Sequence, residues 1–88
     1  MTKYRKRPVE IEAMRFDGEN AHEIEEWAGG KDGKVYPVYT PGGGYLRVKT
    51  LEGELIAIKG DWVLKGVANE FYPCKPHIFK LTYEEVKE

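Results

Sequence analysis

The residues from which most reactive centres are built are scarce in this sequence. It has one cysteine and two histidines in 88 residues, so an internal disulfide is excluded and these side chains fall short of the four ligands that structural zinc takes. A single cysteine is typical of a protein kept in a reducing compartment. We therefore expect no catalytic set, no metal site and no cofactor.

Long apolar runs and an excess of one charge are missing too. No apolar segment approaches the ~20 residues that cross a bilayer, and no signal-peptide core follows the basic start. Lysine and arginine number 14 against 15 for aspartate and glutamate, which gives a formal net charge of −1. No overall field would then draw the chain to membranes or nucleic acid, and we expect a soluble cytoplasmic protein.

Glycine, proline and aromatic residues are what the chain has instead. Its 88 residues favour one domain, residues 1–88, in which residues 1–7 form a flexible basic arm. The ten glycines and five prolines are scattered as in turn-rich β structure. A chain of this size buries relatively little of its surface, so the aromatic rings are expected to form much of the core.

Alternating apolar and polar residues predict a run of short strands joined by tight turns. We expect strands at residues 8–13, 35–40, 45–50, 55–58, 62–67 and 71–74. Pro37 makes the second an edge strand, and residues 41–44 are expected to form a flexible glycine loop. After residue 13 the apolar positions shift to Met14 and Phe16, which indicates either a bulge or a strand end covered on both faces.

Two helical segments interrupt this pattern. Asn20 and Glu23 have the spacing of a capping box, and one apolar stripe runs from Ala21 to Ala28 before a glycine pair ends the helix. Pro76 suits a first helical turn, so we expect a short helix and then a short terminal strand, although residues 78–83 also fit a strand throughout. The expected fold is α+β: a small twisted antiparallel sheet, open or partly closed into a barrel, with one short helix packed on it and a helical turn near the C-terminus.

Several runs of residues are similar to those of a known group of proteins. They are GDWVLKG at residues 60–66, EFYPCKP at residues 70–76, Phe79, Tyr83-Glu84, the opening RPV-x-I-x-A at residues 7–13 and TLEGE at residues 50–54. Together they resemble a group of small phage and prophage proteins of uncharacterised function. That group often has aspartate where this chain has His77, and an aspartate would cap the second helix better. The resemblance covers most of the chain and implies a phage or prophage protein of the bacterial cytoplasm, but it implies no reaction.

The residues that are candidates for chemistry each have a more common structural role. Cys74 and His77 have C-x-x-H spacing, which is half of a zinc site or a nucleophile with its base. A cysteine between two prolines is more often a half-buried small residue. Asp61 is placed to accept hydrogen bonds from a ligand or, more often, from the backbone of its own turn. Residues 41–44 lack the Lys-Ser/Thr pair and the following helix of a phosphate loop.

Binding is therefore favoured over catalysis, with two candidate surfaces. Tyrosine is more abundant than a small core takes up, and the candidates for binding a host or phage protein or a small ligand are Tyr36, Tyr39, Tyr45, Tyr72 and Asp61. The candidates for an alternative nucleic-acid surface are Lys3, Arg5, Lys6 and Arg7 on the arm, with Arg47 and Lys49 on one strand.

Three functions follow in order of preference. The first is a small non-enzymatic binding module. The second is a nucleic-acid accessory protein that acts through its arm, and the third is an enzyme that uses Cys74, His77 or Asp61. Pairing through the edge strand at residues 35–40 would also produce a homodimer, although Pro37 weakens that edge.

Overall fold

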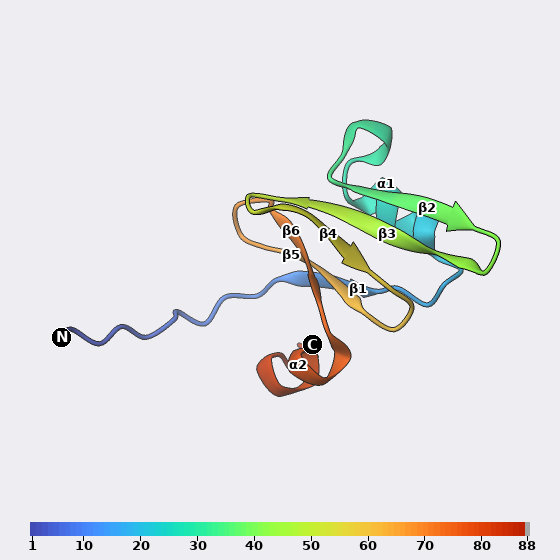
Figure 1. Cartoon of the computed structure of the whole chain (residues 1–88). Coiled ribbons are helices and arrows are strands. Elements are labelled where there is room, and N and C mark those ends of the chain that lie inside the picture. Colours follow the sequence, from blue (N-terminus) through green and yellow to red (C-terminus); the bar gives the residue numbers. More distant parts are fainter. Residues whose placement is uncertain (88) are drawn as a thin grey trace.

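The strands are divided between two antiparallel sheets in the computed structural model, which describes residues 1–87. One sheet has the order β1-β5-β6, from β1 (Glu12–Arg15), β5 (Trp62–Lys65) and β6 (Phe71–Cys74). The other has the order β2-β3-β4, from β2 (Val35–Thr40), β3 (Gly43–Thr50) and β4 (Gly53–Ala57). The helices are α1 (Ala21–Trp27), the 3-10 turn η1 (Gly30–Asp32) and α2 (Pro76–Thr82) (Figure 1). The predicted α+β class is confirmed, without a closed barrel and with two small sheets in place of one.

The hairpins follow the sequence pattern closely, although β4 ends at Ala57 and β5 at Lys65, before the predicted residues 58 and 67. β2 is an edge strand, as Pro37 predicts. The prediction of a flexible glycine loop at residues 41–44 is wrong, because β3 already begins at Gly43 and pairs there with Thr40. The connection is therefore a tight turn, and Gly44 faces Tyr39 within the ladder.

The first strand lies further along the chain than residues 8–13. Glu12 pairs with Lys65, the last residue of β5, so residues 8–11 run past the end of their partner strand and find no ladder. The register is unbroken from Glu12 to Arg15, which excludes a bulge. Ala13 and Met14 are both partly buried on opposite faces, so the two-sided strand is the correct alternative.

The main core lies between the two sheets and α1. Its fully buried side chains include Ile24, Val35, Leu46, Val48 and Val63, with Phe16 and Phe71 beside them. The indole of Trp27 meets the Phe71 ring edge-on at 5.3 Å between centroids, which confirms the predicted apolar stripe of α1.

The predicted capping box at the start of α1 is wrong. In the part of the chain that the structure describes, no side-chain hydrogen bond caps the first turn at Asn20. Instead, the amide of Asn20 donates to the Arg15 carbonyl at 2.7 Å, and the Asp17 carboxylate accepts from the backbone N–H groups of Glu19 and Asn20. These bonds shape the turn that precedes the helix, and they leave Glu23 exposed on its outer side.

A second, smaller layer forms where α2 covers the other face of β1-β5-β6. Trp62 stacks on Phe79 with centroids 4.0 Å apart and rings 9° from parallel, and the hydroxyls of Tyr72 and Tyr83 lie 3.4 Å apart. Pro76 opens the helix as predicted. The prediction of a short strand after this helix is wrong, because residues 83–87 form no strand.

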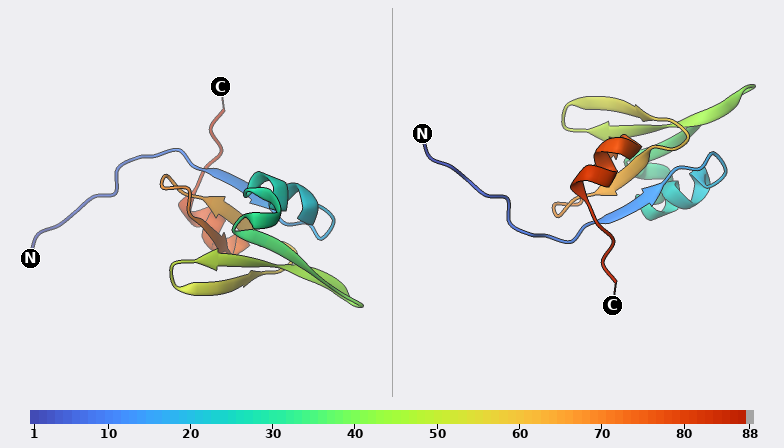
Figure 2. Two further views of the ribbon diagram at one scale, coloured as in Figure 1. Left: turned by 90° about the horizontal axis from the view of Figure 1, so that it is seen from above. Right: turned by 90° about the horizontal axis from the view of Figure 1, so that it is seen from below.

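The N-terminal segment projects from this body. Residues 1–10 are all exposed, and the molecule measures 50 × 27 × 26 Å along its principal axes. Both views in Figure 2 show the segment running out sideways, beyond the ends of both sheets. No helix among residues 1–87 is long and apolar enough to cross a membrane.

Candidate functional site

One face of the β2-β3-β4 sheet is open: no helix or second sheet from residues 1–87 lies over it, as both views in Figure 2 show. Because side chains alternate along a strand, the residues between the core positions point to this side. They are Tyr36 and Val38 on β2, Tyr45, Arg47 and Lys49 on β3, and Glu54 and Ile56 on β4. We call this surface the outer sheet face.

A polar cluster occupies one end of the outer sheet face. The Tyr36 hydroxyl donates to Glu54 Oε1, and the Arg47 guanidinium pairs with Glu54 Oε2. The ammonium group of Lys49 lies 5.4 Å from the centroid of the Tyr36 ring, where the negative face of the ring attracts it. Glu54 thus neutralises Arg47, and Lys49 stays available as a cation.

This cluster shifts two pKa values in opposite directions. The hydrogen bond to Glu54 raises the pKa of Tyr36 above its ordinary value, since losing the proton would bring two anions together. The same hydrogen bond, with the charge of Arg47, lowers the pKa of Glu54. The folded cluster therefore favours the ionised carboxylate.

Replacing Tyr36 with phenylalanine is expected to raise the pKa of Glu54 toward its ordinary value, because the first cause of its lowering is removed. A group with a lowered folded pKa stabilises the fold above its unfolded pKa and loses that effect as the pH falls through the folded pKa. The side-chain carbon shift of Glu54, followed by NMR across acidic pH, measures the change. Tyr39→Phe is the matched control, and an unmoved Glu54 titration in Tyr36→Phe would contradict the hydrogen bond.

Apolar side chains cover the rest of the outer sheet face, from Ile56, which faces Arg47 across β3 and β4, toward the other end. Val38 and Tyr45 face each other across β2 and β3, and Ile56 is 54% exposed on the neighbouring strand. Ile58, which follows the same alternation just beyond β4, is 52% exposed. The face combines exposed aliphatic and aromatic area with a small set of charges, which is the composition of protein interfaces.

The structure brings together only part of the predicted tyrosine set. Tyr36 and Tyr45 share the outer sheet face, and Arg47 and Lys49 join them there. Tyr39 points to the other side at the hairpin tip, where it is 74% exposed and borders a cavity of about 220 Å³ next to the start of α1. Tyr72 lies beneath α2, where burial and the contact with Tyr83 raise its pKa.

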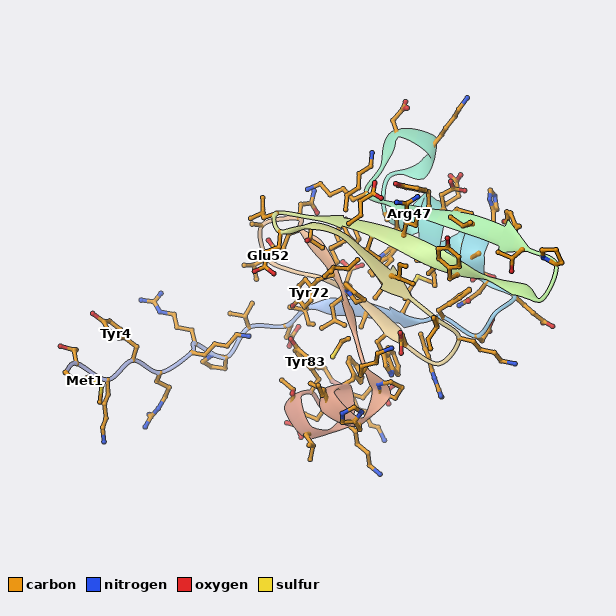
Figure 3. The ribbon with its side chains drawn as sticks, in the orientation of Figure 1. Met1, Tyr4, Arg47, Glu52, Tyr72 and Tyr83 are labelled. Carbon is orange, nitrogen blue, oxygen red and sulfur yellow. The ribbon has the colours of Figure 1, made fainter. Side chains whose placement is uncertain are left out.

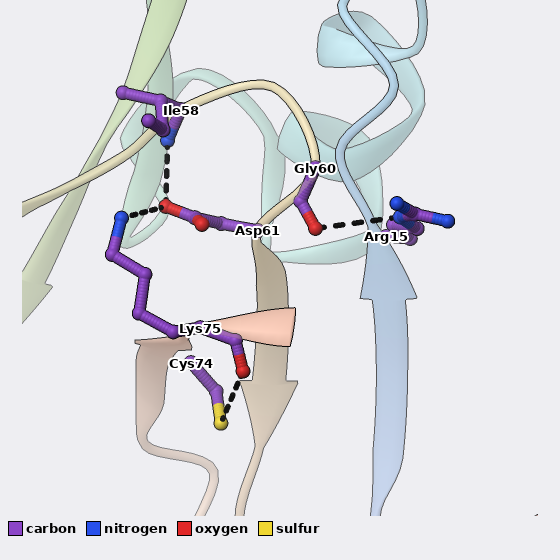
Figure 4. A network of polar contacts seen from close by, with 6 residues as sticks. All are labelled: Arg15, Ile58, Gly60, Asp61, Cys74 and Lys75. Atoms are coloured by element: carbon purple, nitrogen blue, oxygen red, sulfur yellow. Dashed lines mark hydrogen bonds and ion pairs between the residues drawn. The ribbon is translucent and has the colours of Figure 1, made fainter. Parts of the chain in front are cut away.

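Asp61 is buried at the joint between the two sheets (Figure 4). Its Oδ2 atom accepts from the Ile58 backbone N–H and from Lys75 Nζ, both at 2.9 Å. The Asp61 N–H in turn donates to the Ile58 carbonyl at 2.9 Å. The side chain thus has the turn role that the sequence favours, and a lysine from the end of β6 satisfies its charge.

Among the described residues, Cys74 and His77 share no hydrogen bond. Burial, with the nearby negative charge of Asp61, raises the pKa of the Cys74 thiol, so little of the nucleophilic thiolate exists at neutral pH. The Sγ atom lies 3.7 Å from the Lys75 carbonyl, while His77 is exposed on α2. Within residues 1–87, no group of three or more His, Cys, Asp or Glu side chains is arranged to hold a metal ion.

Comparisons add no relative to these observations. The chain matches no model of a protein family, no curated protein and no solved structure. The resemblance to small phage proteins therefore stays a prediction. The function of this chain is inferred from its surfaces.

The predicted basic surface is divided. Lys3, Arg5, Lys6 and Arg7 are exposed on the N-terminal segment, and Figure 3 shows Tyr4 in that segment far from Arg47 on β3. Arg47 and Lys49 therefore do not extend the arm into one basic patch. Each group belongs to a different surface of the molecule.

Sequence reasoning missed three members of the outer sheet face: Val38, Glu54 and Ile56. The period-two pattern of their strands placed each of them opposite a core position, which was a usable signal. The missing information was the pairing register, because Tyr36, Arg47 and Ile56 become neighbours only when three strands are aligned.

Proposed function

We propose that this chain is a small non-enzymatic binding module, of phage or prophage origin, that holds a protein partner on the outer sheet face. The observation that supports the proposal most is that this face leaves Ile56 and Ile58 more than half exposed beside two tyrosines. Contiguous apolar area of this kind is costly in water and usually marks an interaction surface.

The shape and charge of the face favour a protein over the other ligand classes. Small-molecule sites are concave, whereas this site is the open face of a three-stranded sheet. A nucleic acid would bring phosphates close to the Glu54 carboxylate, which already occupies the guanidinium of Arg47. The partner that fits has an apolar surface for Val38, Tyr45 and Ile56, and a carboxylate for Lys49.

The test is capture of a partner from phage-infected bacterial lysate, with variants that separate this face from the rest of the surface. Ile56→Asp and Tyr45→Ala place a charge or a gap at its centre, and Leu51→Asp is the control because Leu51 is fully exposed on the β3–β4 turn. We expect the natural chain and the control to recover the same protein. The two face variants should bind it at least about 10-fold more weakly, as for central interface residues.

Two measurements make the result decisive. Circular dichroism should show that both face variants keep the folded spectrum, and a photocrosslinking residue at position 56 should join the partner covalently. Recovery that is equal for all variants would exclude the outer sheet face. DNA or RNA retention that is abolished by removing residues 2–7 would favour the nucleic-acid alternative instead.

A further inference from the structure

The two ends of the chain enclose a groove of about 1020 Å³ on the side of β1-β5-β6 that α2 covers. Its floor is a ladder of aromatic rings. Trp62 stacks on Phe79, and Phe79 stacks on Tyr83 with centroids 5.2 Å apart. This surface shares no residue with the outer sheet face.

The walls of the groove are the segments that flank the body. Residues 8–11 form one wall, and residues 84–86 form the other. Three exposed carboxylates line them, from Glu10, Glu84 and Glu85. The groove thus has an aromatic floor and an acidic rim, a combination that binds cations by charge and by the ring faces.

The chain itself contains a segment with the complementary charge. Lys3, Arg5 and Arg7 alternate with Tyr4 and Lys6, so an extended backbone puts three cations on one side. These residues are exposed, and the segment continues directly from the groove wall at Pro8 away from the body (Figures 1 and 3). In this arrangement the arm runs away from its own groove, and within residues 1–87 no ion pair joins it to the rim.

We propose that two copies of this chain form a two-fold dimer in which the basic arm of each copy lies in the acidic, aromatic groove of the other. In a closed two-fold dimer each arm lies in the groove of the other copy. Both arms and both grooves are then occupied through the same contact, made twice. Three cations on the arm meet three carboxylates on the rim.

Charge reversal tests this pairing without requiring the arm to be removed. The arm variant carries Lys3→Glu, Arg5→Glu and Arg7→Glu, and the groove variant carries Glu10→Lys, Glu84→Lys and Glu85→Lys. Sedimentation velocity of the natural chain over a wide concentration range should show a dimer that weakens as salt is added. Each variant alone should raise the dimer dissociation constant by about 10- to 100-fold, since several exposed ion pairs become repulsive.

Mixing the two variants is the decisive measurement. The acidic arm of one then faces the basic groove of the other, and the basic arm faces the acidic groove, so both contacts are restored. The mixture should form a heterodimer about as strong as the natural dimer. A control with Lys31→Glu, Lys34→Glu and Lys59→Glu changes the net charge as much as the arm variant and should dimerise like the natural chain.

Three outcomes would overturn the proposal. They are a natural chain that stays monomeric at every concentration and at low salt, variants that dimerise unchanged, and a mixture that does not associate although each variant is folded by circular dichroism. In the first case, retention of the natural chain on DNA or on anionic vesicles, lost in the arm variant, would assign the arm to a phosphate-bearing partner. None of these results bears on the outer sheet face, which the variants leave intact.

Discussion

Replacing Asp61 with alanine is expected to lower the free energy of unfolding by about 3 kcal/mol, because a buried hydrogen-bonded charge pair is opened. The Asp61 side chain is only 3% exposed, whereas the Lys75 side chain is 51% exposed. The lysine can therefore return to water. The Ile58 N–H loses its acceptor, and the turn that joins β4 to β5 loses its internal bond.

The position of that turn makes the loss larger than one hydrogen bond. The segment that follows β1 also hydrogen-bonds to the backbone of this turn. Phe16 N–H donates to the Asp61 carbonyl at 2.8 Å, and Gly60 N–H donates to the Phe16 carbonyl at 2.7 Å. The Arg15 side chain adds a bond to the Gly60 carbonyl at 3.3 Å (Figure 4). The two sheets are thus joined through one turn, and disturbing it loosens both.

Urea unfolding followed by circular dichroism measures this prediction, and two further variants divide its causes. Asp61→Asn keeps an oxygen for the Ile58 N–H and removes the charge, so it should cost about 1 kcal/mol. Lys75→Met leaves the buried carboxylate without its cation and should cost about 1–2 kcal/mol. If Asp61→Ala destabilises no more than Lys75→Met, the hydrogen bond to the turn is unimportant.

Replacing Trp62 with alanine is expected to lower the free energy of unfolding by about 2–3 kcal/mol. The loss is smaller than for a fully buried tryptophan because the ring is only partly covered. The stack on Phe79 attaches α2 to β5. A helix of this length does not persist alone in water, so α2 should unfold locally while the core between the two sheets remains.

Amide hydrogen exchange separates this local effect from a global one. In Trp62→Ala, protection should disappear for residues 79–82 and persist at Leu46 and Val48 in β3. Trp62→Phe retains an aromatic stack and should keep most of the protection in α2. Trp27→Phe is the matched control, since it alters the ring that packs on Phe71 on the opposite face. Uniform loss of protection in Trp62→Ala, or none, would contradict the separate attachment of α2.

The local pattern of the chain determined most of its elements. Alternation located the strands from residue 35 to residue 74, Pro37 placed an edge strand, and Pro76 marked the first turn of α2. The glycine pair at residues 29 and 30 ended α1, and both glycines have the positive φ that this ending requires. These features depend on residues that are adjacent in the chain. They can therefore be predicted from the sequence.

Errors of prediction occurred where a distant partner decides the structure. Residues 8–11 alternate as a strand should, but β5 ends at Lys65 and leaves them unpaired. Asn20 has the spacing of a cap, but its side chain bonds to Arg15 instead. Residues 83–87 lie beyond the sheets, where no neighbouring strand is available for them.

The sequence by itself determined the α+β class, the tight turns, the structural role of Asp61 and the presence of more tyrosine than one core requires. Only the tertiary structure decided which side chains share a surface. It placed Tyr36 and Tyr45 with Arg47 and Lys49, separated them from the basic arm, and assembled a groove from the two ends of the chain. The reason is physical: strand register and sheet packing set these neighbours through contacts between residues far apart in the chain, which local patterns do not encode.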